Sequence, residues 1–165
     1  MIEIRKLEPD DTEAYRALWL YGITEHSTFF RIAPDDDLPM GIPTRFKPDS
    51  FTLGAFAGQI LTGIVSFERD PRTKARHKGL ISRMFVHPGA AGQGAGRELL
   101  QHLICLANDL GDLRYLYLTV LASNTRAIHL YSSMQFREFA REPGAVLING
   151  SYIDELQMAH QLVGT

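Results

Sequence analysis

The sequence predicts one α+β domain built around a largely antiparallel sheet. Residues 51–57 and 60–68 form two strand-like runs joined at Gly58-Gln59, which is a hairpin signal. From Gly94 to Leu110, apolar residues recur at steps of three and four, which predicts a strong amphipathic helix. No internal repeat or linker interrupts the 165 residues, so residues 1–165 are expected to form a single domain.

The first third of the chain predicts one strand, two helices and a loop. Residues 2–7 alternate apolar and charged side chains as a strand does. Pro9-Asp10-Asp11-Thr12 is a helix-start signal, and a helix is expected to run to about Tyr21, where Gly22 interrupts it. Residues 24–31 fit a short second helix. The proline-rich residues 33–50, with the acidic run 35–37, are typical of a long loop.

The remainder alternates strands with helices. Strands are expected at residues 79–86 and 115–121, and a short helix at residues 124–134. Two final strands are expected at residues 136–141 and 152–160, with Asn149-Gly150 as a turn before the last one.

Composition excludes several function classes. The chain is 45% hydrophobic and 22% charged with a net charge of −2, so nothing favours nucleic acid or an anionic membrane as a partner. No apolar run is long enough for a membrane span or a secretory signal. The single cysteine, Cys105, excludes an internal disulfide and is typical of a reducing compartment. A cytoplasmic location is therefore expected.

A glycine-rich segment between the strand at 79–86 and the amphipathic helix carries the functional signal. Gly92, Gly94 and Gly96 alternate at the helix start, where free backbone N–H groups and a partial positive charge favour an anion. A pyrophosphate is the natural candidate. The P-loop lysine is absent, and so is the third glycine of the dinucleotide fingerprint. A plain turn that starts a helix is the other interpretation.

This segment resembles motif A of the GCN5-related N-acetyltransferases, the GNAT superfamily. The resemblance rests on Val86-His87-Pro88, the run Ala91-Gly92-Gln93-Gly94-Ala95-Gly96, and Leu99-Leu100; Ala91 stands where the family has Gln or Arg. It implies a mostly antiparallel sheet with helices on both faces, and acetyl-CoA as cosubstrate. The expected cofactor-binding residues in this segment are Met84, Phe85, Val86, Ala91, Gly92, Gln93, Gly94, Ala95, Gly96 and Arg97.

The helix at 124–134 resembles motif B of the same family. Asn124 and Tyr131 are seven residues apart, so they share one helical face. The resemblance implies that Asn124 contacts the pantetheine arm and that the Tyr131 phenol protonates the thiolate leaving group. From the residues alone, Asn124 could be only a helix cap and Tyr131 a core aromatic. Gln135-Phe136 follows where the family often has Gly-Phe.

The resemblance implies direct attack of a neutral amine on the thioester. Backbone N–H groups of Phe85 or Val86, on a strand that splays from its neighbour, would polarise the carbonyl. Met84 and Val86 would bond the pantetheine amides. Some relatives use a glutamate as general base where this chain has Leu80, so the candidate bases are Glu68 and Glu25. Either could instead be a solvent-exposed carboxylate, and a water chain could serve in their place.

The predicted function is an acetyl-CoA-dependent N-acetyltransferase that moves an acetyl group to a primary amine of a small molecule or protein in a ternary complex. The acceptor is not identified, although the carboxylates of residues 35–37 could attract a cationic amine. The alternatives are a non-catalytic acyl-CoA-binding regulatory module and a nucleotide-binding protein. No metal is expected, because the six histidines lack ligand spacing. A homodimer is a possible state.

Overall fold

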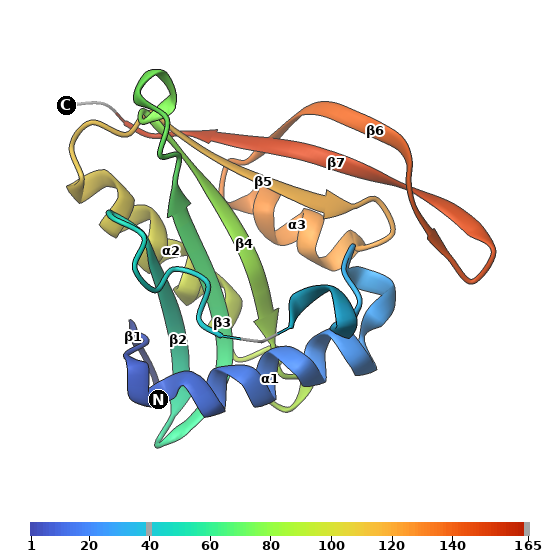
Figure 1. Ribbon diagram of the computed structural model, residues 1–165, viewed down its shortest axis with the longest axis horizontal. Helices are drawn as coiled ribbons and strands as arrows, with labels where there is room; N and C mark the ends of the chain where they lie inside the picture. The colour runs from blue at the N-terminus through green and yellow to red at the C-terminus, as the bar shows by residue number, and fades with distance from the viewer. Residues whose placement is uncertain (39–40, 164–165) are drawn as a thin grey trace.

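The computed structural model describes residues 1–38 and 41–163, which form a seven-stranded sheet in the order β1-β2-β3-β4-β5-β7-β6 (Figure 1). All neighbouring strands are antiparallel except β4 and β5, so the predicted α+β class is confirmed. The strands are β1 Ile2–Lys6, β2 Phe51–Ala57, β3 Ile60–Arg69, β4 Lys78–Val86, β5 Tyr115–Leu121, β6 Arg137–Ile148 and β7 Ser151–Gln161. The helices are α1 Thr12–Glu25, α2 Ala95–Asp109 and α3 Thr125–Ser133.

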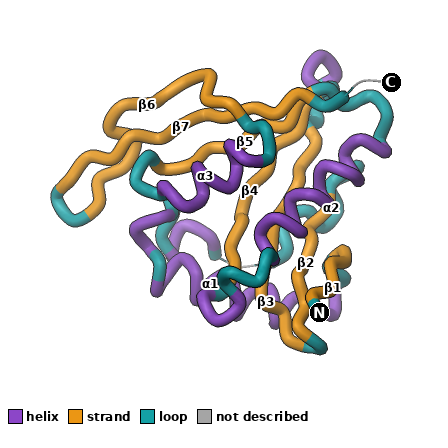
Figure 2. Tube along the Cα trace, turned by 180° about the vertical axis from the view of Figure 1, so that it is seen from behind, coloured by secondary structure: helices purple, strands orange, loops and turns teal. Residues whose placement is uncertain are grey.

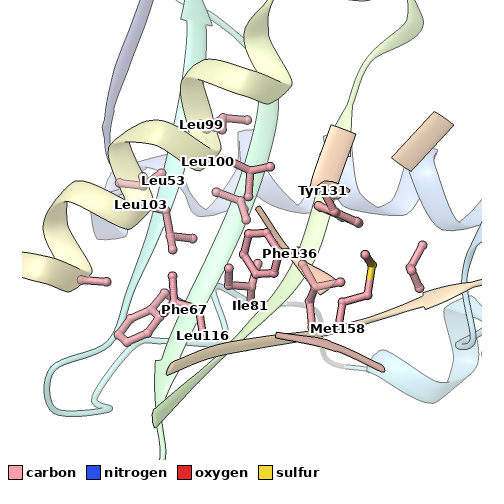
Figure 3. Packing of buried hydrophobic residues seen from close by; sticks show 14 of the residues in the cluster. Leu53, Phe67, Ile81, Leu99, Leu100, Leu103, Leu116, Tyr131, Phe136 and Met158 are labelled. Atoms are coloured by element: carbon pink, nitrogen blue, oxygen red, sulfur yellow. The ribbon is translucent and has the colours of Figure 1, made fainter. Parts of the chain in front are cut away.

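Helices cover both faces of the sheet, as the resemblance implied. Viewed from behind, α2 and α3 lie in front of the strands, whereas α1 lies on the other side (Figure 2). The apolar stripe of α2 packs on the sheet over the larger core, whose residues include Leu99, Leu100, Leu103, Phe67, Ile81 and Leu116 (Figure 3). The smaller core joins α1 to the opposite face and consists of Tyr15, Leu18, Trp19, Ile23, Phe56, Leu61, Ile64 and Phe85.

Helix α1 is longer than the sequence predicted. It continues past Gly22 to Glu25, and the predicted second helix at 24–31 is only a 3-10 turn at Ser27–Phe29. Gly22 does not end the helix because it serves packing: a Cβ there would lie 3.0 Å from Cγ of Phe85. The glycine lets α1 approach β4 closely, and that tertiary contact outweighs its poor helix propensity.

Residues 33–50 contain no strand among those described, which agrees with the predicted loop. A 3-10 turn at Pro34–Asp37 organises its beginning. Residues 39 and 40 of this loop lie outside the described part of the chain.

Strands β4 and β5 separate part-way along their length. They pair in parallel only from Lys78 with Tyr115 to Leu80 with Tyr117, and β4 then continues to Val86 along β3 alone. A β-bulge accompanies the separation, because the β3–β4 register shifts and Arg83 has a φ of 52°, which is uncommon outside glycine. The resulting gap between β4 and β5 is the splay that the resemblance implied.

The C-terminal hairpin is longer than predicted. The strand expected at 136–141 is the twelve-residue β6, which projects with β7 beyond the rest of the sheet (Figure 1). The expected turn is present, with φ of 49° at Asn149 and 78° at Gly150. β6 is largely exposed and contains two register shifts, so apolar residues do not alternate regularly along it. The alternation of apolar residues in the sequence therefore could not predict the full length of this strand.

Candidate active site

The glycine-rich segment forms an open cradle at the start of α2. Gly92 and Gly94 have φ of 79° and 84°, and a Cβ on either would meet no atom within 4 Å. The first α-helical hydrogen bond runs from the Glu98 amide to the Gly94 carbonyl at 3.0 Å. The amides of residues 95–97 precede that bond, so they are not used within the helix. This arrangement can accept an anion from solvent.

A cavity of about 680 Å³ lies beside this cradle. It brings together all but one of the residues predicted to bind the cosubstrate: Met84, Phe85, Val86, Ala91, Gly92, Gly94, Ala95, Gly96, Arg97, Asn124 and Tyr131. Gln93 does not line it. We call this space the cofactor cavity.

Basic side chains stand on both sides of the cofactor cavity. The Arg97 guanidinium crosses from α2 to α3, where it donates to Ser133 Oγ at 2.9 Å. Arg126 lines the same cavity from the first turn of α3. Together with the N-terminal end of the α2 dipole, they make this end of the cavity favourable for negative charge.

Helix α3 positions both motif B residues. The Asn124 side chain caps the helix by accepting from the Ala127 amide at 3.2 Å, so its capping role is present alongside its place in the cavity wall. The ring of Tyr131 packs against Phe136, with ring centroids 6.0 Å apart. Burial raises the pKa of Tyr131 to about 12. Its hydroxyl has no hydrogen-bond partner among the described residues, so it remains available to a ligand.

A second cavity of about 380 Å³ adjoins the first. The two cavities share Phe29, Phe30, Met84, Asn124 and Tyr131 in their walls. Four ionisable side chains besides Tyr131 also line the second cavity: Arg31, Glu68, Arg83 and Glu155. We call this space the acceptor cavity, since it shares Tyr131 with the cofactor cavity but is lined by none of the cradle glycines.

Two arginines of the acceptor cavity hold ion pairs. Arg31 Nη1 lies 2.7 Å from Glu155 and 3.3 Å from Glu142. Glu155 is the main reason that the pKa of Arg31 is raised. Arg83 binds Asp37 through both terminal nitrogens, one of them at 2.7 Å, and also donates to the Tyr15 hydroxyl at 3.2 Å.

The predicted acids fall in different places. Glu68 lines the acceptor cavity and accepts from Lys47 Nζ at 2.6 Å. Glu25 is exposed at the end of α1 and lines neither cavity. Asp37 is held by Arg83 and by the Trp19 indole N–H, so it is already committed to protein partners. These hydrogen bonds outweigh the opposing effect of burial and hold the pKa of Asp37 below its usual range.

Comparison with known proteins shows the family of this chain. The model of the acetyltransferase (GNAT) family matches residues 7–136. The chain belongs to the GNAT family. A solved GNAT acetyltransferase from Streptococcus pneumoniae agrees with this GNAT domain, with a TM-score of 0.84 and 27% identity over 98% of this chain and 99% of that one. A GCN5-related N-acetyltransferase from Kribbella flavida shares the fold, with a TM-score of 0.85 at 23% identity, covering 98% of each chain.

Two curated relatives share part of the sequence. An L-2,4-diaminobutyric acid acetyltransferase from Vibrio cholerae is 31% identical over 97 residues, which is 59% of this chain and 51% of the relative. An L-amino acid N-acyltransferase from Escherichia coli is 31% identical over 104 residues, which is 62% of this chain and 59% of the relative. The GNAT domain therefore spans only between about half and three fifths of these relatives' lengths.

The described residues contain neither a candidate metal centre nor a candidate membrane-spanning helix. Among residues 1–38 and 41–163, no group of three His, Cys, Asp or Glu side chains could hold a metal ion. No helix within the same ranges is long and apolar enough to cross a membrane.

Sequence reasoning missed most of the acceptor side of the site. Phe29, Phe30 and Arg31 follow α1 and close over β4 and β5, which lie far along the chain. Glu155 lies within the strand predicted at residues 152–160, where nothing in the sequence indicated a functional role. Arg126 stands two residues after Asn124, and its charge beside motif B was a signal that could have marked it.

Proposed function

We propose that this GNAT domain transfers the acetyl group of acetyl-CoA to the primary amine of a small, amino-acid-like molecule. One observation carries the proposal: two cavities adjoin at Tyr131, one beside a glycine cradle and one lined by charged groups of both signs. A donor and an acceptor could therefore be bound together, as direct attack in a ternary complex requires.

The cofactor cavity suits coenzyme A. A side chain on Gly92 or Gly94 would project into open space, so the bare backbone there leaves room for a diphosphate. The amides of residues 92–97 would bind the diphosphate, with Arg97 and Arg126 supplying positive charge. Asn124 and the open edge of β4 at Met84 and Val86 would bond the pantetheine arm.

The reacting groups follow from the gap in the sheet. Acetyl-CoA supplies an acyl group activated as a thioester. The amide of Phe85 or Val86, on the part of β4 that β5 does not cover, would donate to the thioester carbonyl and stabilise the oxyanion. Because its pKa is raised to about 12, the Tyr131 phenol keeps its proton at neutral pH and can donate it to the departing sulfur.

The acceptor cavity favours a molecule that carries both an amine and a carboxylate. Arg31 uses only Nη1 in its ion pairs, so its other nitrogens can donate to a carboxylate. Glu155 lies beside it and can attract an ammonium group. The curated relatives act, by their names, on L-2,4-diaminobutyric acid and on L-amino acids, which agrees with this charge arrangement. Of the predicted bases, Glu68 reaches this cavity and is a candidate, whereas Glu25 would need a rearrangement.

The test is a binding and turnover experiment. Calorimetry with acetyl-CoA and with ATP measures which cofactor binds, and release of free thiol is followed with L-2,4-diaminobutyrate, several L-amino acids, spermidine, an aminoglycoside and a peptide N-terminus. We expect acetyl-CoA binding and turnover with the amino acids. Binding without any turnover would instead support an acyl-CoA-binding regulatory module, and ATP binding alone would refute the acetyltransferase assignment.

A further inference from the structure

Glu155 is a buried carboxylate with one oxygen open to the acceptor cavity. The residue is only 4% exposed, and its Oε1 accepts from Arg31 Nη1 at 2.7 Å. No donor among the described residues reaches Oε2. Since every fully buried polar side-chain atom in that part of the chain has a partner, Oε2 must be partly accessible, and Glu155 lines the acceptor cavity. A charged oxygen without a protein partner, facing a cavity, can bind a cationic ligand.

The strand register places Glu155 beside the part of the β4–β5 gap that Met84 and Leu121 flank. Glu155 pairs with Leu121 of β5, so their side chains share the face that lines the acceptor cavity. Four residues beyond the last β4–β5 pair, Met84 and Leu121 flank the gap. Met84 is one of the residues common to both cavities. Glu155 therefore lies where an amine would approach the thioester.

The other charged groups of the cavity are less suited to this position. Glu68 pairs with Leu80, four residues before Met84, which corresponds to roughly 13 Å of strand, and it is held by Lys47. Arg83 is occupied by Asp37 and Tyr15. Arg31 offsets the cost of burying the Glu155 charge, and Glu142 shares that arginine from outside the cavity.

We propose that Glu155 binds the ammonium group of the acceptor and removes one of its protons before the amine attacks. This role rests on the proposed function and replaces Glu68 as the general base. Arg31 then has a second role, because it fixes the Glu155 carboxylate through Nη1 and also lines the same cavity.

The proposed step balances in protons and bonds. An N–H bond of the ammonium breaks, and its proton passes to Glu155 Oε2 and then to solvent. The nitrogen lone pair forms the C–N bond to the thioester carbon, and collapse of the tetrahedral adduct breaks the C–S bond. The sulfur takes a proton from Tyr131, and the second proton lost by the nitrogen returns to the phenolate through solvent.

The experiment compares Glu155→Gln with two matched variants, Glu142→Gln and Glu68→Gln. Glu142 binds the same arginine from exposed β6, and Glu68 is the rival acid of the same cavity. With acetyl-CoA and the best acceptor of the panel, we expect Glu155→Gln to lower kcat/KM about 100-fold at pH 7. Acetyl-CoA affinity should stay within about threefold of wild type. Glu142→Gln should keep kcat/KM within about threefold, whereas Glu68→Gln, which tests the rival base, should lower kcat/KM less than Glu155→Gln does.

The pH profile separates proton transfer from a structural role. Without the carboxylate, only amine that is already neutral can react, so kcat/KM of Glu155→Gln should rise about tenfold per pH unit toward the amine pKa. The kcat/KM of the wild type should reach its plateau at a lower pH than that of Glu155→Gln. Glu155→Asp keeps a charged oxygen and should restore part of that plateau, which a packing role would not do.

The outcomes are distinguishable. Wild-type protein that binds acetyl-CoA but acetylates no acceptor contradicts the proposed function itself. An active wild type with Glu155→Gln unchanged, or with a loss that is the same at every pH, overturns only the role of Glu155. A loss of kcat/KM seen only in Glu68→Gln would identify Glu68 as the general base.

Discussion

At the scale of single residues, Tyr131 shows how burial prepares a side chain for chemistry. Its ring packs against Phe136 in the larger core, and the residue lines both cavities. Burial disfavours the phenolate and raises the pKa of Tyr131 to about 12. A group of this kind keeps its proton at neutral pH, so it can hydrogen-bond to the sulfur and donate a proton to it as the C–S bond breaks.

We expect Tyr131→Phe to lower kcat about 100-fold and to leave the acetyl-CoA dissociation constant nearly unchanged, because the ring and its packing are kept. In the wild type, the acid should remain protonated as the pH rises to 10, so no alkaline loss of kcat should come from this group. Steady-state kinetics and calorimetry measure both effects. Tyr152→Phe, at an exposed position of β7, is the control. Full turnover by Tyr131→Phe would remove the acid role.

Glu155 and Glu68 show that the residue type alone does not fix a role. Both are carboxylates on strands beside the acceptor cavity. Glu155 keeps one oxygen without a partner among the described residues and lies level with the gap between β4 and β5. Glu68, on β3, lies further from that gap and is held by Lys47. Position in the sheet register, rather than chemistry, distinguishes them.

At the scale of elements, helix α2 joins the core to the cradle. Its apolar stripe is buried in the larger core, and its N-terminus carries the glycines that face the cofactor cavity. The same helix therefore fixes the cradle relative to β4. Cofactor affinity should be sensitive to changes at its N-terminal end only.

The two ends of α2 provide a matched pair of mutations. Gly94 and Gly111 have φ of 84° and 78°, and both face open space. We expect Gly94→Glu to weaken acetyl-CoA binding at least 100-fold through steric and charge conflict with the diphosphate. Gly111→Glu introduces the same backbone strain at a position outside the cavity, so this variant should bind acetyl-CoA normally. Calorimetry measures both, and unfolding curves measure the shared strain. Equal affinity of the two variants would contradict the assignment of the cradle.

At the scale of the whole molecule, ion pairs tie the segment after α1 to the sheet. Arg31 reaches Glu155 on β7, and Asp37 binds Arg83 at the bulge of β4. These contacts cross between parts of the chain that are far apart in sequence. They hold the segment that walls the acceptor cavity, so acceptor binding should depend on them.

We expect Asp37→Asn to raise the acceptor KM several-fold and to speed amide hydrogen exchange in residues 27–38, because the partly buried Arg83 loses its carboxylate partner. The cost in the free energy of unfolding should be about 1–3 kcal/mol. Asp35→Asn, an exposed neighbour in the same acidic run, should change neither quantity. If exchange and KM are the same in both variants, the tie between loop and sheet has no functional consequence.

The sequence by itself determined the elements that surround the cofactor cavity. These elements show local patterns, namely the glycines of the cradle, the apolar stripe of α2, and the pair Asn124 and Tyr131. Each pattern lies within a single element, so its spacing along the chain predicts how its residues are arranged. Gly22 shows the limit of such patterns, since only the Phe85 ring packed against it explains why α1 continues.

Only the tertiary structure decided the acceptor half. That cavity is lined by the segment after α1 and by β3, β4, β5 and β7. No local sequence pattern in any of these elements indicates that they come together. The role proposed for Glu155 depends on its pairing with Leu121 and on an arginine 124 positions away. Non-local pairing of strands and ion pairs across the sheet place these charges, and no periodicity along the chain encodes them.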